Sequence, residues 1–155
     1  MIINFGVIRT VLFNFLLGRK RADYHEKAGD RFRQENGRRP EVTTTQTGLQ
    51  WEVLRAAEGP RPGSSSQVVV HYQGRLVNGV EFDSSYARQM PLEISLLEVI
   101  SGWREGLQLM AVGSQYRFVV PPERAYGNTG AGLLIPEMST LIFEVELIEI
   151  LPKQS

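Results

Sequence analysis

Two segments of this chain alternate apolar and polar residues with the period of two that is typical of a half-buried β-strand. A strand with this pattern buries one face only, so the alternation requires a sheet with one side against a core. The chain is therefore expected to fold around a sheet rather than as a bundle of helices. The apolar positions, in residues 68–76 and 140–151, are Val68, Val70, Tyr72 and Leu76, then Leu141, Phe143, Val145 and Leu147.

The rest of the second half supports the same architecture. Asn78-Gly79 is a turn signal, and residues 98–110 form the single helical pattern of this part, with Trp103, Leu107 and Met110 on one face. The sequence thus predicts an α+β fold, a curved antiparallel β-sheet wrapped around one short helix. Further strands are expected at residues 49–55, 90–96 and 116–120, and a long loop at residues 121–139.

The first part of the chain has a different composition and is predicted to be a helical extension. Residues 18–37 carry opposite charges three and four apart, which favours an exposed polar helix, and Gly37 and Pro40 end it. A polar, β-branched connector follows at residues 41–48. We place the domain boundary there, with an N-terminal extension and linker in residues 1–42 and the main domain in residues 43–155.

Residues 1–17 are apolar but interrupted by polar residues such as Arg9, and they fall short of the roughly 18 clean apolar residues of a membrane span. Three alternatives stay open: a helix docked on its own body or on a partner, a membrane-surface anchor, and a mis-set start or degenerate signal. Weak self-association or membrane association through residues 2–17 is therefore expected. The helical face consists of Ile8, Val11, Leu12, Phe15 and Leu16.

Charge and cysteine content exclude several classes of function. The net charge is zero, with nine Lys/Arg against five Asp/Glu in residues 1–48 and eight against twelve in residues 49–155, so no nucleic-acid partner is predicted. The chain has no cysteine, which excludes disulfides, thiol nucleophiles and cysteine zinc sites. Both the cytoplasm and the periplasm remain open as compartments.

The usual catalytic patterns are also missing. Neither His25 nor His71 lies in a setting that suggests a metal ligand or a general base, and the glycine spacings fit no phosphate-binding loop. No metal and no cofactor is expected. What remains is a set of rings with a single acid, which suits an apolar shaped pocket, although aromatic residues also fill ordinary cores. The set comprises Tyr72, Phe82, Asp83, Trp103, Tyr126 and Phe143.

The segments that carry these residues resemble the FK506-binding protein (FKBP) family of peptidyl-prolyl cis-trans isomerases. The similarity covers about residues 43–151, and two further segments, TTTQTGLQWEVL and GAGLLIP, look like the bacterial subgroup related to macrophage infectivity potentiator. The resemblance implies the FKBP-like fold and rotation of Xaa-Pro bonds in protein substrates, an activity that assists folding. The alternative is a non-catalytic peptide-binding or chaperone module. The segments are VVVHYQGRLVNGVEFDSS (68–85), VISGW (99–103), RAYG (124–127) and TLIFEVEL (140–147).

The resemblance also implies roles for individual residues. Trp103 would form the floor under the prolyl ring, and Asp83 would be the lone acid of the wall, hydrogen-bonded to a tyrosine. The N–H of Ile100 and the hydroxyl of Tyr126 would hold substrate carbonyls. The catalytic residues would be Tyr72, Asp83 and Tyr126, and the substrate-binding residues Phe82, Val99, Ile100, Trp103, Leu134, Ile135 and Phe143, with Leu133, Leu134 and Ile135 as a flap over the cleft.

The implied partners are unfolded or folding polypeptides that contain proline, and the macrolide inhibitors FK506 and rapamycin. Three positions depart from the common family pattern: Leu92 replaces a phenylalanine, Ala131 a histidine and Glu137 a proline. These departures bear on ligand affinity and sequence preference rather than on activity. The helical region before the domain is shorter than in the bacterial subgroup, which puts the usual dimer of that subgroup in question.

Overall fold

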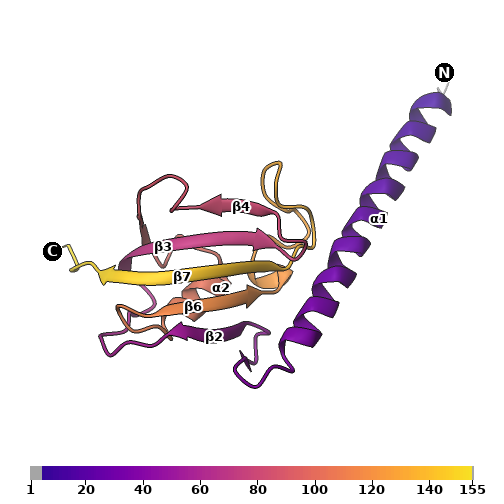
Figure 1. Ribbon diagram of the computed structural model, residues 1–155. Helices are drawn as coiled ribbons and strands as arrows, with labels where there is room; N and C mark the ends of the chain where they lie inside the picture. Colours follow the sequence, from indigo (N-terminus) through magenta and orange to yellow (C-terminus); the bar gives the residue numbers. More distant parts are fainter. Residues whose placement is uncertain (1–4, 155) are drawn as a thin grey trace.

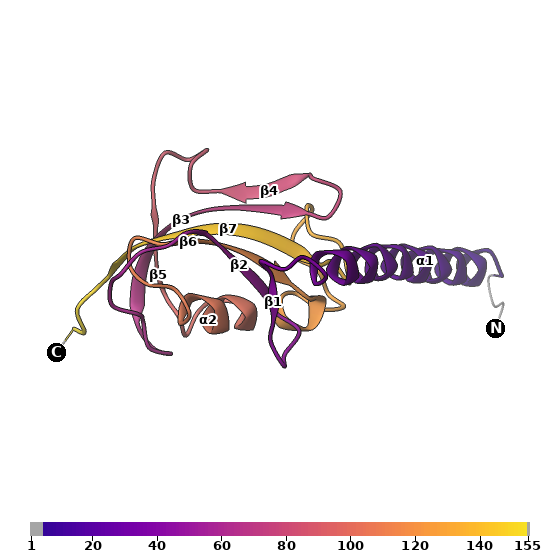
Figure 2. The same ribbon diagram turned by 60° about the horizontal axis from the view of Figure 1, so that its bottom comes forward.

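The computed structural model describes residues 5–154, with side chains in the first helix described from Leu12 onward. A curved, seven-stranded antiparallel sheet forms the body, and a long helix, α1 (Phe5–Asn36), extends away from it (Figures 1 and 2). The spatial order is β1-β2-β6-β7-β3-β4, and β5 also pairs with β3. The strands are β1 (Thr43–Thr44), β2 (Gln50–Arg55), β3 (Gln67–Leu76), β4 (Glu81–Ser84), β5 (Leu92–Ser95), β6 (Gln115–Val120) and β7 (Leu141–Ile150).

The core lies between the sheet and a short helix, α2 (Ser101–Leu107), which packs under the curve of the sheet (Figure 2). The alternation in β3 and β7 is confirmed, because the apolar positions that the sequence pattern assigned to the core, such as Val70 and Val145, are buried and the polar ones between them are not. Gly106 allows α2 to approach the sheet closely, since a Cβ there would lie 2.6 Å from the ring of Phe118. The α2 face of Trp103, Leu107 and Met110 is buried, as its spacing predicts.

The predicted fold class is confirmed, with differences in detail. The turn at Gly79 is present and has the positive φ of 89° that glycine tolerates. The helix predicted over residues 98–110 is shorter at both ends than expected. Two strands, β1 and β4, were not expected, and a 3₁₀ turn (Pro122–Arg124) begins the long loop before β7. Residues 129–137 of that loop are called the flap below.

The apolar and polar parts of the N-terminal extension form one continuous helix rather than two separate segments. It ends at Asn36, and the N–H of Gly37 closes the last turn on the carbonyl of Arg33, so the predicted end is confirmed. Neither helix of the described part combines the length and apolar character that crossing a membrane requires. The side chains of Ile8 and Val11 lie outside the described part.

The protein's own body leaves the described apolar end of α1 uncovered. Phe13 and Phe15 are 62% and 63% exposed, and Leu12, Leu16 and Leu17 are also exposed. The expectation that this end docks on the body is therefore not met from Leu12 onward. The remaining prediction is that a partner protein or a membrane surface covers these apolar side chains.

The other end of α1 is held firmly against the sheet. Asn36 is buried and donates from Nδ2 to Oε1 of Gln50 at 2.8 Å, while Nε2 of Gln50 donates to the carbonyl of Arg33 at 2.8 Å. A Cβ at Gly29 would collide with the hydroxyl of Thr140, so α1 lies against the residue just before β7. These contacts fix the direction in which α1 leaves the body.

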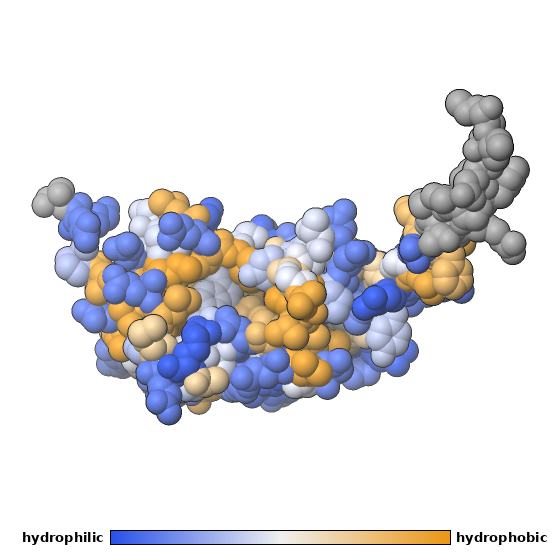
Figure 3. All heavy atoms as spheres, turned by 90° about the horizontal axis from the view of Figure 1, so that it is seen from above, coloured by the Kyte–Doolittle hydropathy of each residue, from blue (hydrophilic) through white to orange (hydrophobic). Residues whose placement is uncertain are grey.

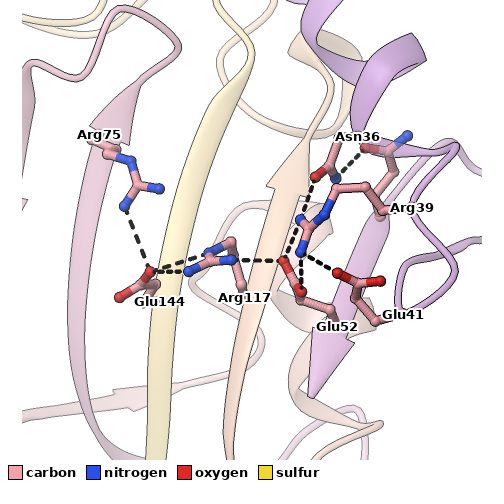
Figure 4. A network of polar contacts seen from close by, with 8 residues as sticks. Asn36, Arg39, Glu41, Glu52, Arg75, Arg117 and Glu144 are labelled. Carbon is pink, nitrogen blue, oxygen red and sulfur yellow. Dashed lines mark hydrogen bonds and ion pairs between the residues drawn. The ribbon is translucent and has the colours of Figure 1, made fainter. Parts of the chain in front are cut away.

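A row of alternating charges crosses the outer face of the sheet and reaches this joint (Figure 4). Glu52 on β2 is buried and accepts from both Nη atoms of Arg39 at 2.9 Å and from Nη1 of Arg117 at 2.7 Å. Arg117 on β6 also donates to Glu144 on β7 at 2.7 Å, and Arg75 on β3 lies 3.6 Å from the same carboxylate. Glu52 thus joins the linker after α1 to the central strands.

We expect Glu52→Gln to lower the free energy of unfolding at pH 7 by about 2 kcal/mol, because the buried carboxylate that pairs with the partly exposed Arg39 and Arg117 loses its charge. Burial acts to raise the pKa of Glu52, but hydrogen bonds from Arg39 and Arg117 outweigh it and hold the pKa below its ordinary value. The carboxylate therefore stabilises the fold above its unfolded-state pKa, and this contribution disappears as pH falls through the folded-state pKa.

Urea unfolding at pH 7 and at about pH 3.5 measures this difference between variant and parent, which should shrink at the lower pH. Glu41→Gln is the matched control, because Glu41 binds the same Arg39 from an exposed position and its loss should have no measurable effect. Equal stability of Glu52→Gln and its parent at pH 7 would show that the network adds nothing to the fold.

Candidate functional site

A cavity of about 450 Å³ opens between the sheet and the start of α2. On the face in Figure 3, apolar residues gather on both sides of a hollow, with a separate apolar group on α1. Eight of the ten site residues predicted from the sequence line this cavity. They are Tyr72, Phe82, Asp83, Val99, Ile100, Trp103, Tyr126 and Phe143, joined by Leu92, Ile94, Glu98 and Ala125.

The floor and one wall of the cavity are a set of aromatic rings in edge-to-face contact. Trp103 of α2 is 5% exposed and meets Tyr72 of β3 at 5.0 Å and Phe143 of β7 at 5.3 Å between ring centroids. Phe82 of β4 contacts Phe143 at 5.6 Å with the rings nearly perpendicular. Edge-to-face packing holds rings in fixed positions, so the cavity has a defined apolar shape.

Polar groups are concentrated at one edge of the cavity. The hydroxyl of Tyr72 donates to Asp83, and Arg88 binds both the Asp83 carboxylate and, at 3.0 Å, the Tyr72 hydroxyl. The Arg88 guanidinium also lies 5.6 Å from the centre of the Tyr72 ring. Burial and then the hydrogen bond to Asp83 raise the pKa of Tyr72, so its hydroxyl stays protonated at neutral pH.

Two groups at the rim are available to a ligand. The N–H of Ile100, which precedes the first turn of α2, donates to no carbonyl or side chain in the part of the chain that the structure describes. Tyr126 lines the cavity and is 40% exposed, and its hydroxyl makes no hydrogen bond to any described residue. A donor from each side could therefore bind a carbonyl oxygen over the apolar floor.

The flap lies apart from this cavity. Leu134 is 55% exposed and Ile135 is buried in the core, and neither lines the cavity. The flap is closed by paired hydrogen bonds between Ala131 and Ile135 at 2.9 and 3.1 Å, and Leu133 at its tip is fully exposed. None of the three predicted flap residues, Leu133, Leu134 and Ile135, lines the cavity in this structure.

Sequence reasoning missed two residues that shape the site. Arg88 lies in an irregular loop, and no spacing rule connects it with Asp83. Gly74, in the middle of β3, lies under Phe82 and Phe143, where a Cβ would come within 2.6 and 2.9 Å of their rings. Glycine inside a strand signals a close approach, so Gly74 could have been found from the sequence.

Comparison with known proteins agrees with this geometry. Residues 59–148 match the family model described as FKBP-type peptidyl-prolyl cis-trans isomerase. Residues 17–53 match the model of the domain amino terminal to FKBP-type peptidyl-prolyl isomerase. The first match spans β3 to most of β7, and thus every residue that lines the cavity.

Individual relatives extend the comparison. The chain is 48% identical over 123 residues to the FKBP-type 22 kDa peptidyl-prolyl cis-trans isomerase of Escherichia coli, covering 79% of this chain and 60% of the relative. It is 43% identical to the peptidyl-prolyl cis-trans isomerase Mip of Coxiella burnetii over 79% of this chain and 53% of the relative. The chain therefore spans little more than half the length of these curated relatives.

The crystal structure of FkpA from Escherichia coli superposes with a TM-score of 0.84 at 37% identity, covering 97% of this chain and 74% of that one. The resemblance seen in the sequence, including the subgroup, is thereby confirmed. Since family model, relatives and fold agree over the segment that forms the aromatic cavity, the chain belongs to the FKBP-type peptidyl-prolyl cis-trans isomerase family.

Proposed function

We propose that this protein catalyses cis-trans rotation of Xaa-Pro bonds in unfolded or folding polypeptides. The observation that carries the proposal is the aromatic cavity over Trp103, which has the apolar shape that a prolyl ring requires. Two carboxylates are among its lining residues, Asp83 and the exposed Glu98. No cofactor and no covalent intermediate is needed for this reaction.

Rotation of an Xaa-Pro bond is slow because the planar amide is stabilised by resonance, with a barrier of about 18–20 kcal/mol. In the twisted transition state the carbonyl is less polarised, so water favours the planar ground state. A cavity that excludes water removes this advantage, and a shape that fits the twisted amide adds binding present only in the transition state. Rings rather than titrating groups are therefore sufficient.

Within this proposal each group has a distinct role. The prolyl ring lies on Trp103, and the N–H of Ile100 and the hydroxyl of Tyr126 bind substrate carbonyls. Tyr72 and Asp83 lie at the wall beside the rotating carbonyl, and Arg88 holds both in place. Phe82, Val99 and Phe143 contact the proline from the sides. Leu134 and Ile135 contact only those substrates that are long enough to reach the flap.

The proposal is tested with a tetrapeptide that has a bulky apolar residue before proline. We expect the purified protein to accelerate cis-trans exchange of this peptide. FK506 and rapamycin should compete with the peptide, because both occupy the prolyl site in proteins of this family. Heat-denatured protein is the control. Rates equal to the uncatalysed reaction at micromolar protein, with the peptide still bound, would establish the non-catalytic peptide-binding alternative.

We further propose that residues 43–155 fold and act without residues 1–42. The cavity residues all lie between Tyr72 and Phe143 in the sequence. Glu52 still accepts a hydrogen bond from Arg117 when Arg39 is removed. We expect the shortened chain to be less stable but to keep tetrapeptide rates within about twofold, or 0.4 kcal/mol. An unfolded or inactive shortened chain would show that α1 belongs to the catalytic body.

A further inference from the structure

The two groups that would bind substrate carbonyls lie on different elements. The N–H of Ile100 precedes the first turn of α2, whereas Tyr126 follows the 3₁₀ turn (Pro122–Arg124) in the loop between β6 and β7. Ile100 is half-buried and Tyr126 is exposed, so packing in the core does not by itself fix both groups. A carbonyl on each of them can be bound only if the start of α2 and this loop keep a constant spacing.

The start of α2 lies directly against the backbone of the loop. Ser101 donates from Oγ to the carbonyl of Arg124 at 3.3 Å, and a Cβ on Gly102 would lie 3.2 Å from the same oxygen. Arg124 is two residues before Tyr126, so this contact bears on the spacing between the two carbonyl-binding groups. A single neutral hydrogen bond of this length stabilises an orientation only weakly, so a second contact between the same elements is required to hold it.

Glu105 supplies this second contact, one helical turn after Ser101 on α2. Its Oε2 accepts from Nη2 of Arg124 at 3.2 Å and from the hydroxyl of Thr47, in the linker before β2, at 2.6 Å. Figure 2 shows the linker around β1, α2 and the loop after β6 side by side beneath the sheet. Glu105 therefore joins the linker and α2 to the turn that leads to Tyr126.

The pair of Glu105 and Arg124 is partly shielded from water, which makes it stronger than an exposed ion pair. The side chains of Arg124 and Glu105 are 30% and 23% exposed, and Nε of Arg124 is buried without a hydrogen-bond partner among the described residues. Burial acts to raise the pKa of Glu105, but hydrogen bonds from Thr47, Thr45 and Arg124 outweigh it and hold the pKa below its ordinary value. The carboxylate is therefore ionised at neutral pH, and it compensates the charge of the Arg124 guanidinium.

The pair acts at the rim of the cavity and not on its floor. Neither Glu105 nor Arg124 is among the residues that line the cavity, so neither contacts the substrate directly. Trp103, in contrast, is buried and is held by its edge-to-face contacts with Tyr72 and Phe143. Loss of the pair should therefore alter the loop before Tyr126 while the aromatic floor keeps its shape.

We propose that Glu105 and Arg124 are positioning residues of the isomerase site, which together hold the hydroxyl of Tyr126 in a fixed place relative to the N–H of Ile100. Without the pair, the Ser101 hydrogen bond has to hold the loop against α2, and the hydroxyl is no longer kept where it can bind a carbonyl. This inference rests on the proposed function. It adds that two residues outside the cavity determine how tightly the peptide backbone beside the proline is bound.

The test removes the carboxylate from the full-length chain and measures substrate binding separately from rotation. Glu105→Ala suits this purpose, since alanine keeps the helical propensity of α2. We expect KM for an Xaa-Pro tetrapeptide, and Kd for a fluorescein-labelled tetrapeptide measured by anisotropy, to rise about fivefold, which is the effect of one lost hydrogen bond. The value of kcat should stay within about twofold, because a carbonyl contact that is present in both the ground state and the transition state affects KM alone.

A double-mutant cycle with Tyr126→Phe separates positioning from a general structural effect. Tyr126→Phe alone should raise Kd about fivefold, because it removes the hydroxyl itself. Glu105→Ala added to Tyr126→Phe should raise Kd by less than about twofold further, since a hydroxyl that is already absent cannot be displaced. A contact that only stabilises the fold would give the same change in both backgrounds.

Variants of the turn supply a repeat and a matched control. Arg124→Leu breaks the pair from its other side and should reproduce the rise in KM and Kd. Arg124→Lys keeps a cation for the single oxygen that Arg124 contacts, and should stay within about twofold of the parent. Glu123→Ala removes a carboxylate from an exposed position of the same turn and should change neither value. Urea unfolding at pH 7 shows whether each variant is folded under the assay conditions.

Several results would contradict the inference. Parental KM and Kd in both Glu105→Ala and Arg124→Leu would show that the pair does not set the spacing, and an undiminished change in the Tyr126→Phe background would show that it acts elsewhere. A lower kcat with unchanged Kd would place its effect on rotation rather than on carbonyl binding.

The outcome does not depend on a single variant. If Glu105→Ala does not fold, Arg124→Leu decides by the same cycle with Tyr126→Phe, and if neither folds the pair is purely structural and the inference is wrong. A parent chain that binds the tetrapeptide without isomerising it would refute the proposed function alone, because Kd is measured independently. A parent chain that does not bind the peptide would refute both.

Discussion

Replacement of Asp83 by valine should reduce kcat/KM for an Xaa-Pro tetrapeptide by about 10- to 100-fold, or about 1.4–2.7 kcal/mol. The carboxylate accepts the Tyr72 hydroxyl and binds Arg88, so its loss frees two polar groups at the wall beside the rotating carbonyl. The fold should change little in stability, because the Asp83 side chain is 39% exposed. Protease-coupled or NMR exchange rates measure the effect.

Two companion variants separate the possible causes. Asp83→Asn keeps an acceptor for Tyr72 but removes the charge that holds Arg88, so its kcat/KM should lie between those of the parent and Asp83→Val. Glu93→Val removes a carboxylate from an exposed position of the neighbouring β5 and should leave the rate unchanged. Parental activity in Asp83→Val would mean that shape alone carries the catalysis.

The long strands could be predicted from the sequence, because the burial of one face produces their alternation of apolar and polar residues. Residues such as Tyr72 and Val145 alternate with polar neighbours through the middle of β3 and β7, and both strands formed as predicted. The two-residue β1 and the four-residue β4 show no such alternation. Their strands depend on pairing with β2 and β3, which a local pattern does not contain.

The residues of the site divide in the same way into those that the sequence indicates and those that only the tertiary fold brings together. Trp103 and Phe143 lie at buried positions of regular elements, and the family resemblance placed them in the cavity where the structure has them. Arg88, on an irregular loop, reaches Tyr72 only through the tertiary fold. The face of α1 that the flap approaches was equally hidden, because the charge spacing that predicts the polar helix does not indicate it.

Gly74→Ala should lower both stability and activity, although it adds a single methyl group. In β3 the new Cβ would come within 2.6 Å of Phe82 and 2.9 Å of Phe143, closer than carbon atoms pack. Overpacking of this kind costs about 1–3 kcal/mol of unfolding free energy. Because both rings line the aromatic cavity, they can yield only by moving into it or by opening the β3–β4 contact.

We expect kcat/KM for the tetrapeptide to fall at least tenfold in Gly74→Ala, mainly through a higher KM, since the displaced rings occupy the space of the prolyl ring. Gly63→Ala is the control, because its Cβ would meet nothing closer than 3.8 Å and its backbone is not left-handed. Gly74→Ala with Phe82→Leu should recover stability, as the smaller side chain leaves room for the methyl group, but not the full affinity for proline. A destabilised Gly74→Ala with parental kcat/KM would show that the rings move outward, and that the prolyl ring is bound by Trp103 and the α2 side of the cavity alone.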